Sequence, residues 1–381
     1  MNLSLNEVVQ SPVNHRGKPG GENHFPKEPH MPNTPVRFGM VGAGGIAQSY
    51  AAAFRDCTVA KLVAVADVRA EAAQAIAQTL NANNYGSHSE MCDAEQLDAV
   101  IVVTPPNSHS DIVTDLLRRK LHVLCEKPLT VDSATARQMF ATADEVDRKL
   151  TMATKFRFAE DVIRAKALIQ SGILGDVILF ENAFTARVDM SSRWNSNPAI
   201  SGGGVLIDNG THSVDIVRYL LGPITELQVV EGRRVQQLPV EDTVRMFVHT
   251  HSVVNASIDL SWSINKEQPN YISVYGSQGT VHVGWKESKY RRSQDDAWIV
   301  FGQGYNKVQA FKGQIENFAK AVNGQDKLLV TAEDAIASVE VIEAAYRALN
   351  HTQWEPVAAD VATAASVSSE HLEPVAVAAA V

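Results

Sequence analysis

Hydrophobic positions from Val36 onward fall into short continuous runs that alternate with longer segments of helical spacing. The continuous runs cover 36–41, 61–66, 98–103 and 122–125. The helical spacing covers 46–54, 70–80, 111–119 and 132–146. Strand and helix in strict turn predict right-handed βαβ units and a parallel sheet covered on both faces, because only buried strands are apolar on both sides. This part is therefore predicted to be a doubly wound Rossmann domain.

The pattern changes after about residue 154. One helix ends at Gly172, in the manner of a glycine C-cap, and strand-like runs then dominate up to residue 285. Several of these runs alternate apolar and polar residues, which is typical of an antiparallel sheet with one solvated or partner-facing side. Two helices are predicted over 311–323 and 332–349, the second announced by a capping box at Thr331. The fold class is α/β throughout.

The length of 381 residues predicts two domains. We place the first domain at 35–154 and the second at 155–356. The segments 1–34 and 357–381 have low-complexity or weakly apolar compositions and are predicted to be disordered. A net charge of −9 argues against nucleic-acid or anionic-membrane partners, which need a basic surface. A small-molecule ligand is the expected partner.

The cysteines and the apolar runs indicate a cytoplasmic setting. Cys57, Cys92 and Cys125 are an odd number without a C-x-x-C pair, so they predict no disulfide framework. No run of 18 apolar residues is present, and the N-terminal segment lacks the basic and apolar regions of a secretory signal. We therefore expect no membrane contact.

A glycine-rich turn joins the first predicted strand to the first predicted helix. Gly42, Gly44 and Ala47 fit G-x-G-x-x-G/A, in which the small residues allow a tight turn, close approach of a pyrophosphate, and close helix packing. Gly45 and Ile46 then offer the unpaired N–H groups of a helix N-terminus to phosphate. The pattern predicts a dinucleotide site.

The second predicted strand ends at Asp67, close to the spacing at which an acid receives the ribose hydroxyls of the adenosine. An acid there repels a 2′-phosphate, so NAD is favoured over NADP. Arg69 is an opposing signal, because arginine can pair with that phosphate. The alternative is that Asp67 only caps the following helix.

Two further segments follow predicted strands at the edge where open α/β sheets bind ligands. The sequence TPPNSH places Thr104, Asn107 and His109 at this edge, and EKP places Glu126 and Lys127 there. The residue before a proline avoids the α conformation, and this peptide bond is a candidate for cis. The alternative for Lys127 is a solvated loop lysine.

The segment 201–222 carries three glycines followed by an apolar helix with Asp208 and His212 four residues apart, hence on one helical face. The glycines indicate close approach to another group at the start of this helix. Asp208 is predicted to orient an imidazole whose pKa lies near working pH. The alternative is a surface pair.

His249 and His251 lie on one face of a predicted strand, but no third ligand follows at recognisable spacing. We therefore predict no metal site.

Taken together, GAGGIA, TPPNSH, CEKPLT and the segment 201–222 resemble the Gfo/Idh/MocA family of glucose-fructose oxidoreductases and inositol dehydrogenases. The resemblance covers about 36–355. It implies a Rossmann domain, a second α/β domain with a large, open, mostly antiparallel sheet, and bound NAD(P). It also implies hydride transfer at a secondary alcohol of a sugar, sugar derivative or cyclitol, and assembly through the open sheet face into a homodimer or homotetramer.

The resemblance also implies roles for individual residues. His212 would remove the hydroxyl proton while Asp208 fixes its tautomer, and Lys127 would hydrogen-bond the substrate oxygen. In some members the lysine is the base instead, and the sequence leaves this open. Glu126 resembles a contact of the nicotinamide ribose.

This chain departs from the family at TKFRF, where Lys155 stands in place of the Asn found in many members. Arg157 is predicted to lie near the substrate. Lys155 is compatible with a carboxylated or phosphorylated sugar, or with a solvated side chain. The loop at 191–197 is expected to contribute to specificity.

Two other functions compete with a simple dehydrogenase. A member that recycles tightly bound NAD, such as a sugar oxidoreductase or NAD-dependent glycosidase, would not depend on added NAD. A dinucleotide-sensing regulator would need no chemistry, but this chain keeps Lys127, Asp208 and His212.

Overall fold

The computed structural model describes residues 34–351 and 353–357, all of which belong to one compact unit. The two segments predicted to be disordered lie outside the described residues except at Thr34 and Val357. Val357 is buried and donates its backbone N–H to Thr225 O over 2.9 Å, so it belongs to the folded part rather than to the predicted tail.

The first sheet has six parallel strands in the order β3-β2-β1-β4-β5-β6, which confirms the doubly wound prediction. Its strands are β1 (Val36–Val41), β2 (Ala60–Ala66), β3 (Asn83–Tyr85), β4 (Ala99–Val102), β5 (His122–Glu126) and β6 (Leu150–Ala153). The pattern analysis missed β3 because its three residues are polar or aromatic and carry no apolar run. Chain order reverses between β1 and β4, and ligands of such sheets bind at that point.

Helices cover both faces of this sheet. They are α1 (Gly45–Arg55), α2 (Ala70–Leu80), α3 (His88–Ala94), α4 (His109–Arg118) and α5 (Ser133–Glu145). The buried side chains of α1 and α2 form one core cluster with the sheet, and those of α3, α4 and α5 belong to a second. The parallel sheet is thus buried on both sides, as its continuous apolar strands require.

The second sheet has nine strands in the order β14-β13-β12-β11-β7-β10-β9-β8-β15. They are β7 (Val177–Thr185), β8 (Ile224–Glu231), β9 (Thr243–Thr250), β10 (Asn255–Ser261), β11 (Asn270–Gly276), β12 (Gly279–Gly284), β13 (Ser288–Arg292), β14 (Ile299–Gly302) and β15 (Glu355–Pro356). Within the described residues β7 and β10 pair in parallel and the other neighbours are antiparallel. The predicted mostly antiparallel sheet is confirmed.

One face of the nine-stranded sheet carries the core and the other does not. Side chains of α6 (Glu160–Gln170), α8 (Val205–Leu221) and α10 (Ala332–Ala348) pack on the inner face. Burial alternates along β9, where Val244, Met246 and Val248 are buried. Arg245 and Phe247 point the other way and are exposed.

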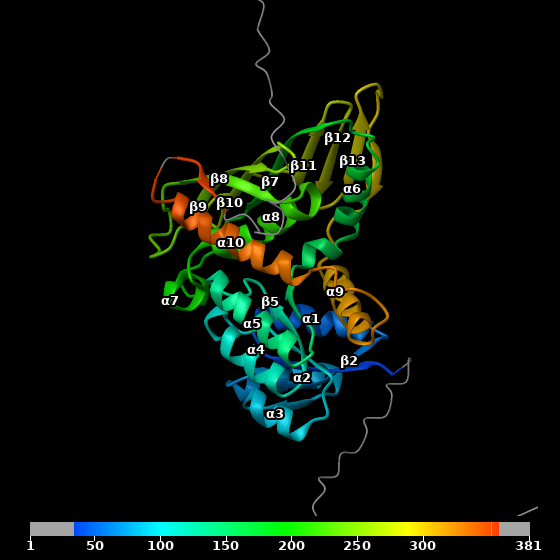
Figure 1. Cartoon of the computed structure of the whole chain (residues 1–381), viewed down its shortest axis with the longest axis vertical. Coiled ribbons are helices and arrows are strands. Elements are labelled where there is room, and N and C mark those ends of the chain that lie inside the picture. The colour runs from blue at the N-terminus through cyan, green and yellow to red at the C-terminus, as the bar shows by residue number, and fades with distance from the viewer. Residues whose placement is uncertain (1–33, 352, 358–381) are drawn as a thin grey trace, which may run out of the picture. The chain divides into compact units, whose positions relative to one another are not determined.

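The helix α9 (Lys307–Val322) belongs to the second half by sequence but packs in the core of the first. Phe311, Ile315 and Phe318 lie in one cluster with Phe38 and Tyr50. The following helix α10 contributes to both the second Rossmann cluster and the core of the large sheet. Figure 1 shows α9 and α10 between the parallel sheet below and the large sheet above. The two helices join the two sheets through shared cores.

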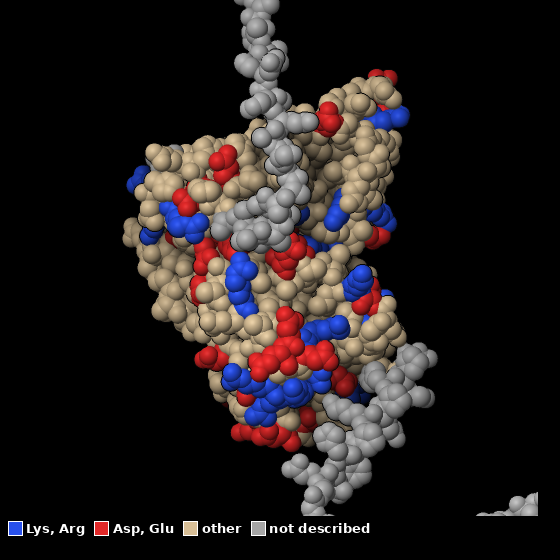
Figure 2. Space-filling view, in the orientation of Figure 1, with Lys and Arg blue, Asp and Glu red and all other residues tan. Residues whose placement is uncertain are grey.

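Charged side chains of both signs are interspersed on the face shown in Figure 2. The net charge of −9 is therefore not gathered into one acidic patch on that face. Among the described residues, no helix is both long and apolar enough to cross a bilayer.

Candidate active site

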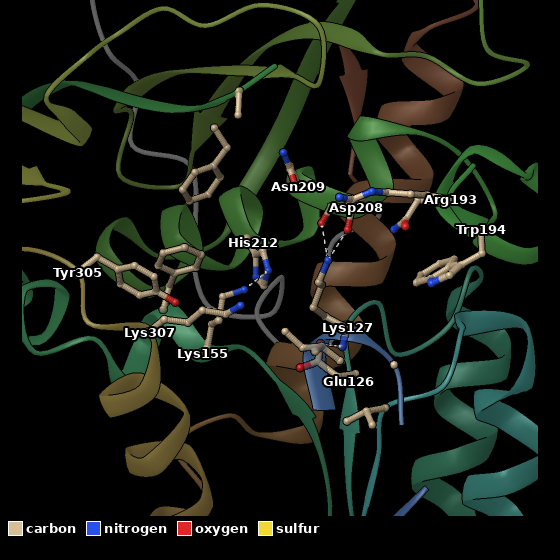
Figure 3. A pocket seen from close by; sticks show the side chains of 18 of the residues that line it. Glu126, Lys127, Lys155, Arg193, Trp194, Asp208, Asn209, His212, Tyr305 and Lys307 are labelled. Atoms are coloured by element: carbon tan, nitrogen blue, oxygen red, sulfur yellow. Dashed lines mark hydrogen bonds and ion pairs between the residues drawn. The ribbon is translucent and has the colours of Figure 1, made fainter. Parts of the chain in front are cut away.

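A cavity of about 910 Å³ opens where the carboxyl ends of the Rossmann strands face α8 and the large sheet (Figure 3). Its walls come from both halves of the chain. The lining residues are Gly44, Gly45, Ile46, Val103, Thr104, Glu126, Lys127, Lys155, Phe156, Phe184, Thr185, Ala186, Ser192, Arg193, Trp194, Asn195, Asp208, Asn209, His212, Trp285, Tyr305 and Lys307.

The glycine turn forms the part of the cavity at the start of α1. Gly42 has a φ of +102°, and a Cβ there would lie 2.9 Å from the carbonyl of Val103, so both backbone conformation and space demand glycine. No heavy atom lies within 4 Å of a Cβ built on Gly44 or Gly45, and both line the cavity. The N-terminus of α1 therefore presents open backbone to the cavity.

Asp67 follows β2 and holds the glycine turn from the neighbouring strand. Its Oδ2 accepts a hydrogen bond from Ala43 N over 2.6 Å, and its Oδ1 accepts one from Arg69 N over 2.8 Å. Burial alone would raise the pKa of Asp67, but the hydrogen bonds from Arg69 and Ala43 outweigh burial and lower it. The group is a carboxylate at neutral pH, and its side chain also pairs with the Arg69 guanidinium.

The segment TPPNSH only partly faces the cavity. Thr104 lines it, but Asn107, in a 3₁₀ turn over Pro106–Ser108, is exposed outside the lining. His109 is fully buried, with Nε2 2.8 Å from Thr104 O and Nδ1 3.0 Å from Pro128 O. The predicted cofactor contact of His109 is therefore wrong, because both ring nitrogens join two loops of the protein. Asn107 does not reach the cavity either.

Glu126 lines the cavity at the end of β5 and is held by buried partners. Its Oε1 accepts a hydrogen bond from the Tyr50 hydroxyl over 2.8 Å, and that hydroxyl accepts one from Gln314 Nε2 over 2.9 Å. Its Oε2 accepts from Lys127 N over 3.0 Å. These bonds fix the carboxylate at the edge of the cavity.

Lys127 and Asp208 meet across the cavity from opposite halves of the chain. The Lys127 ammonium lies 2.5 Å from Asp208 Oδ1 and donates a second hydrogen bond to Asp208 O over 3.0 Å. The two side chains are 13% and 23% exposed, so the pair is shielded but open to a ligand. The peptide bond between Lys127 and Pro128 is cis.

His212 lies one turn along α8 from Asp208 but pairs with another residue. Its Nε2 is 2.7 Å from Nζ of Lys155, which belongs to a 3₁₀ turn over Lys155–Phe158. Its Nδ1 is buried and finds no hydrogen-bond partner among the described residues. The expectation that Asp208 orients the His212 ring is therefore wrong in this structure, because the carboxylate turns to Lys127 (Figure 3).

Burial and the two cations beside His212 determine its charge. Burial, then the ammonium groups of Lys155 and Lys127, hold the pKa of His212 well below its usual value, so the ring is neutral. Burial and the neighbouring Lys127 also lower the pKa of Lys155, to about 7. Lys155 is thus a cation that can lose its proton near neutral pH.

Both halves of the chain match known families. Residues 36–154 match the oxidoreductase family with an NAD-binding Rossmann fold, and residues 162–282 match the GFO/IDH/MocA C-terminal domain. The chain belongs to the Gfo/Idh/MocA family. It is an NAD-binding oxidoreductase by this membership.

Several named proteins are similar to this chain. Inositol 2-dehydrogenase of Rhizobium meliloti is 28% identical over 338 residues, which cover 82% of this chain and 97% of that protein. D-glucoside 3-dehydrogenase of Escherichia coli is 32% identical over 197 residues, or 50% and 56% of the two chains. A levoglucosan dehydrogenase solved with NADH and levoglucosan has the same fold, with a TM-score of 0.78 at 18% identity over 86% of this chain and 100% of that one.

The family's dinucleotide fits the residues present. The open backbone at Gly44 and Gly45 leaves room for a pyrophosphate at the N-terminus of α1, and Asp67 directly follows the adjoining strand. Ile46 and Thr104 extend the same wall. No group of three or more His, Cys, Asp or Glu side chains suited to a metal occurs in the described part of the chain.

The glycines before α8 approach the protein's own residues rather than a ligand. A Cβ on Gly203 would lie 1.8 Å from the Tyr346 hydroxyl, and one on Gly204 would lie 2.0 Å from Glu241 O. Glu241 Oε1 accepts hydrogen bonds from Gly204 N, Leu206 N and Tyr346 Oη. The run therefore lets a buried carboxylate bind the helix N-terminus, where its charge is favourable.

Arg157 does not line the cavity, so its predicted substrate contact is wrong. Its guanidinium is 4% exposed, donates to Asp215 Oδ1 over 2.9 Å and lies 2.9 Å from Asp334 Oδ2. These carboxylates belong to α8 and α10. Arg157 joins the two helices as a buried structural cation.

Several lining residues from three parts of the chain could not be named individually from the sequence. Arg193, Trp194 and Asn195 come from the loop at 191–197, which had been expected near the substrate. Trp285, Tyr305 and Lys307 come from segments without any recognisable motif. Only their place in the fold brings them to the cavity.

The buried ion pairs of Arg157 generate a stability prediction. Arg157→Met leaves Asp215 buried without its cation, so the free energy of unfolding should fall by about 3–5 kcal/mol. Denaturant unfolding measures this loss. Arg164→Met, which breaks an exposed pair with Glu160, should cost under about 0.5 kcal/mol. If Arg157→Met raised KM and left the free energy of unfolding unchanged, the result would support the predicted contact between Arg157 and the substrate.

Proposed function

We propose that this protein oxidises a secondary alcohol of a sugar, sugar derivative or cyclitol, with NAD as the hydride acceptor. The observation that carries the proposal is the single cavity that joins the glycine turn to Lys127, Asp208 and His212. The names of the relatives, an inositol 2-dehydrogenase and a D-glucoside 3-dehydrogenase, support the substrate class. Its three cysteines are free thiols, which agrees with the proposed location in the cytoplasm.

The chain's own residues supply the acid–base chemistry. A bound nicotinamide would supply the hydride acceptor. Lys127 carries an ammonium that donates to the substrate oxygen and stabilises the negative charge that develops there. Asp208 holds this ammonium in place from the opposite wall. His212 is neutral, so it has a lone pair with which to accept the hydroxyl proton.

Lys155 restricts this proton transfer. Its Nζ lies on the Nε2 side of the His212 ring, and Nδ1 is buried without a hydrogen-bond partner among the described residues. His212 can therefore accept a substrate proton at Nε2 only after Lys155 shifts. Asp208 already binds Lys127, which favours His212 over Lys127 as the base.

The proposed roles of Lys127 and His212 predict large losses of turnover. Lys127→Ala removes the donor to the developing charge, and His212→Ala removes the proton acceptor, so each should lower kcat at least ~100-fold. NAD should still bind, as measured by fluorescence titration, because neither side chain builds the glycine turn. Turnover within ~3-fold of the parent protein in either variant would remove that residue from the mechanism.

The proposed preference for NAD over NADP rests on Asp67. Asp67→Ala should weaken NAD and narrow the ratio of NADP to NAD dissociation constants, because the carboxylate no longer repels a 2′-phosphate and Arg69 is freed from its pair. Asp56→Ala, an exposed acid at the end of α1, is the matched control. An unchanged ratio would show that Asp67 does not read the ribose.

We also propose a homodimer or homotetramer formed through the outer face of the large sheet. Leu179, Val230 and Phe247 are exposed on the outer face of β7, β8 and β9, which is unusual for a face that meets only water. Light scattering at working concentration should give two or four times the chain mass. A monomer would contradict this assembly.

A further inference from the structure

The cavity holds more positive than negative charge. Four cations line it, Lys127, Lys155, Arg193 and Lys307, against the carboxylates of Glu126 and Asp208. Both carboxylates are already occupied. Asp208 binds Lys127, and Glu126 accepts from the Tyr50 hydroxyl and a backbone N–H.

Lys155 and Lys307 are two of these cations, and they form a pair on one side of the cavity (Figure 3). Their ammonium nitrogens lie 5.9 and 6.0 Å from the centroid of one ring, that of Phe311. Figure 3 shows both chains reaching the same side of the cavity, with Lys127 between this pair and Arg193. The backbones that carry them are far apart in sequence, since Lys155 follows β6 and Lys307 is the first residue of α9. The fold therefore brings two cations that are far apart in the sequence to one side of the cavity. One of them, Lys155, contacts His212.

Neither member of the pair is neutralised by the protein. Among the described residues, no carboxylate lies within ion-pair distance of Lys155 or Lys307. Lys155 instead contacts neutral His212, and its pKa is lowered to about 7 partly by this environment. Cations without a carboxylate partner repel one another in this part of the cavity, and a bound anion would offset this repulsion.

We propose that a carboxylate or phosphate group of the substrate binds between Lys155 and Lys307. This inference rests on the proposed function and narrows its substrate class to an acidic or phosphorylated sugar or cyclitol. Each ammonium has three N–H donors. It can therefore donate to one anionic oxygen and still keep a contact with a neighbouring protein group. Arg193 adds positive field from the other side of Lys127.

The anion also resolves the obstruction at His212. An anionic group near Lys307 competes with Nε2 of His212 for the Lys155 ammonium. When Lys155 turns to the anion, Nε2 becomes free to accept the hydroxyl proton. A neutral substrate offers Lys155 no such partner, so the anion should raise kcat as well as lower KM.

The state of Lys155 makes the binding of anions depend on pH. The ammonium form binds the anion, so affinity should fall as pH rises above about 7 in the free protein. Bound anion favours the ammonium form and raises its pKa, so the affinity falls between the pKa of Lys155 in the free protein and its higher pKa in the complex. The charged and titratable groups that face Lys155 are Glu126 and Lys127 after β5, Asp208 and His212 on α8, and Lys307 on α9.

The first experiment compares matched sugars as substrates of the full chain with NAD. Glucose, glucose 6-phosphate and glucuronate differ in charge on one ring, and inositol with its monophosphate forms a second set. The proposal expects kcat/KM at least ~10-fold higher for an anionic member than for its neutral parent. A neutral parent that is the better substrate would overturn it. Failure of every sugar to reduce NAD would count against the proposed function, and the anion site is then decided by binding.

The second experiment therefore measures binding of inorganic sulfate, whose charge is constant between pH 6 and 9. Protein saturated with NADH is titrated with sulfate against chloride of equal ionic strength, and binding is followed by intrinsic fluorescence and by melting temperature. Sulfate binding that weakens above pH 7 supports the site. Absence of sulfate-specific binding overturns it. Binding seen only without NADH assigns the two lysines to the cofactor phosphates and also overturns it.

Variants locate the anion in both experiments. Lys155→Met and Lys307→Met should each weaken sulfate binding at least ~10-fold and lower the anionic-to-neutral ratio of kcat/KM by a similar factor. Lys307→Arg should recover most of the binding because it keeps the charge. Lys312→Met, on the same helix but outside the cavity, should leave both measurements unchanged. Equal effects of Lys312→Met and Lys307→Met would show a general charge effect and refute the site.

Discussion

The contact between Lys127 and Asp208 sets the geometry on which the rest of the site depends. Lys127 directly follows β5 of the nucleotide-binding sheet, and Asp208 lies in the first turn of α8, a helix that covers the large sheet. A 2.5 Å contact between their side chains therefore fixes the width of the cavity between the two halves. Because the pair is partly shielded, removal of either partner would leave a charge that the surroundings do not solvate well. The ammonium is held where a substrate oxygen would approach it.

The use of Asp208 for this contact has electrostatic consequences for the other side chains. With that carboxylate engaged, no acid among the described residues orients His212, and burial together with the two nearby ammonium groups keeps its ring neutral. Lys155 takes the position next to the ring instead. Neutral histidine and an excess of cations are thus two results of one pairing. The same pairing makes the cavity suited to a negatively charged ligand.

Sequence patterns predicted local features better than partners across the cavity. Backbone sterics within a few residues predict the turn at Gly42. The end of the second predicted strand predicts the position of Asp67. His109 and Arg157 fall in segments with the right motif, yet their partners are Pro128 and Asp334, from other loops and helices. The spacing of four residues placed Asp208 and His212 on one helical face. It could not show that Asp208 would pair with Lys127 and that His212 would pair with Lys155. Pairing depends on tertiary neighbours that no local window contains.

The helix α9 shows how a distant segment enters the site. Phe311 packs 4.5 Å from Tyr50 between ring centroids, and the hydroxyl of Tyr50 holds Glu126. Gln314, one turn later, donates to the same hydroxyl. The first residue of this helix, Lys307, is therefore positioned by the same buried contacts that fix a carboxylate at the cofactor side. A change in the packing of Phe311 would shift the cation and the carboxylate together, which makes substrate charge recognition and cofactor geometry parts of one rigid arrangement.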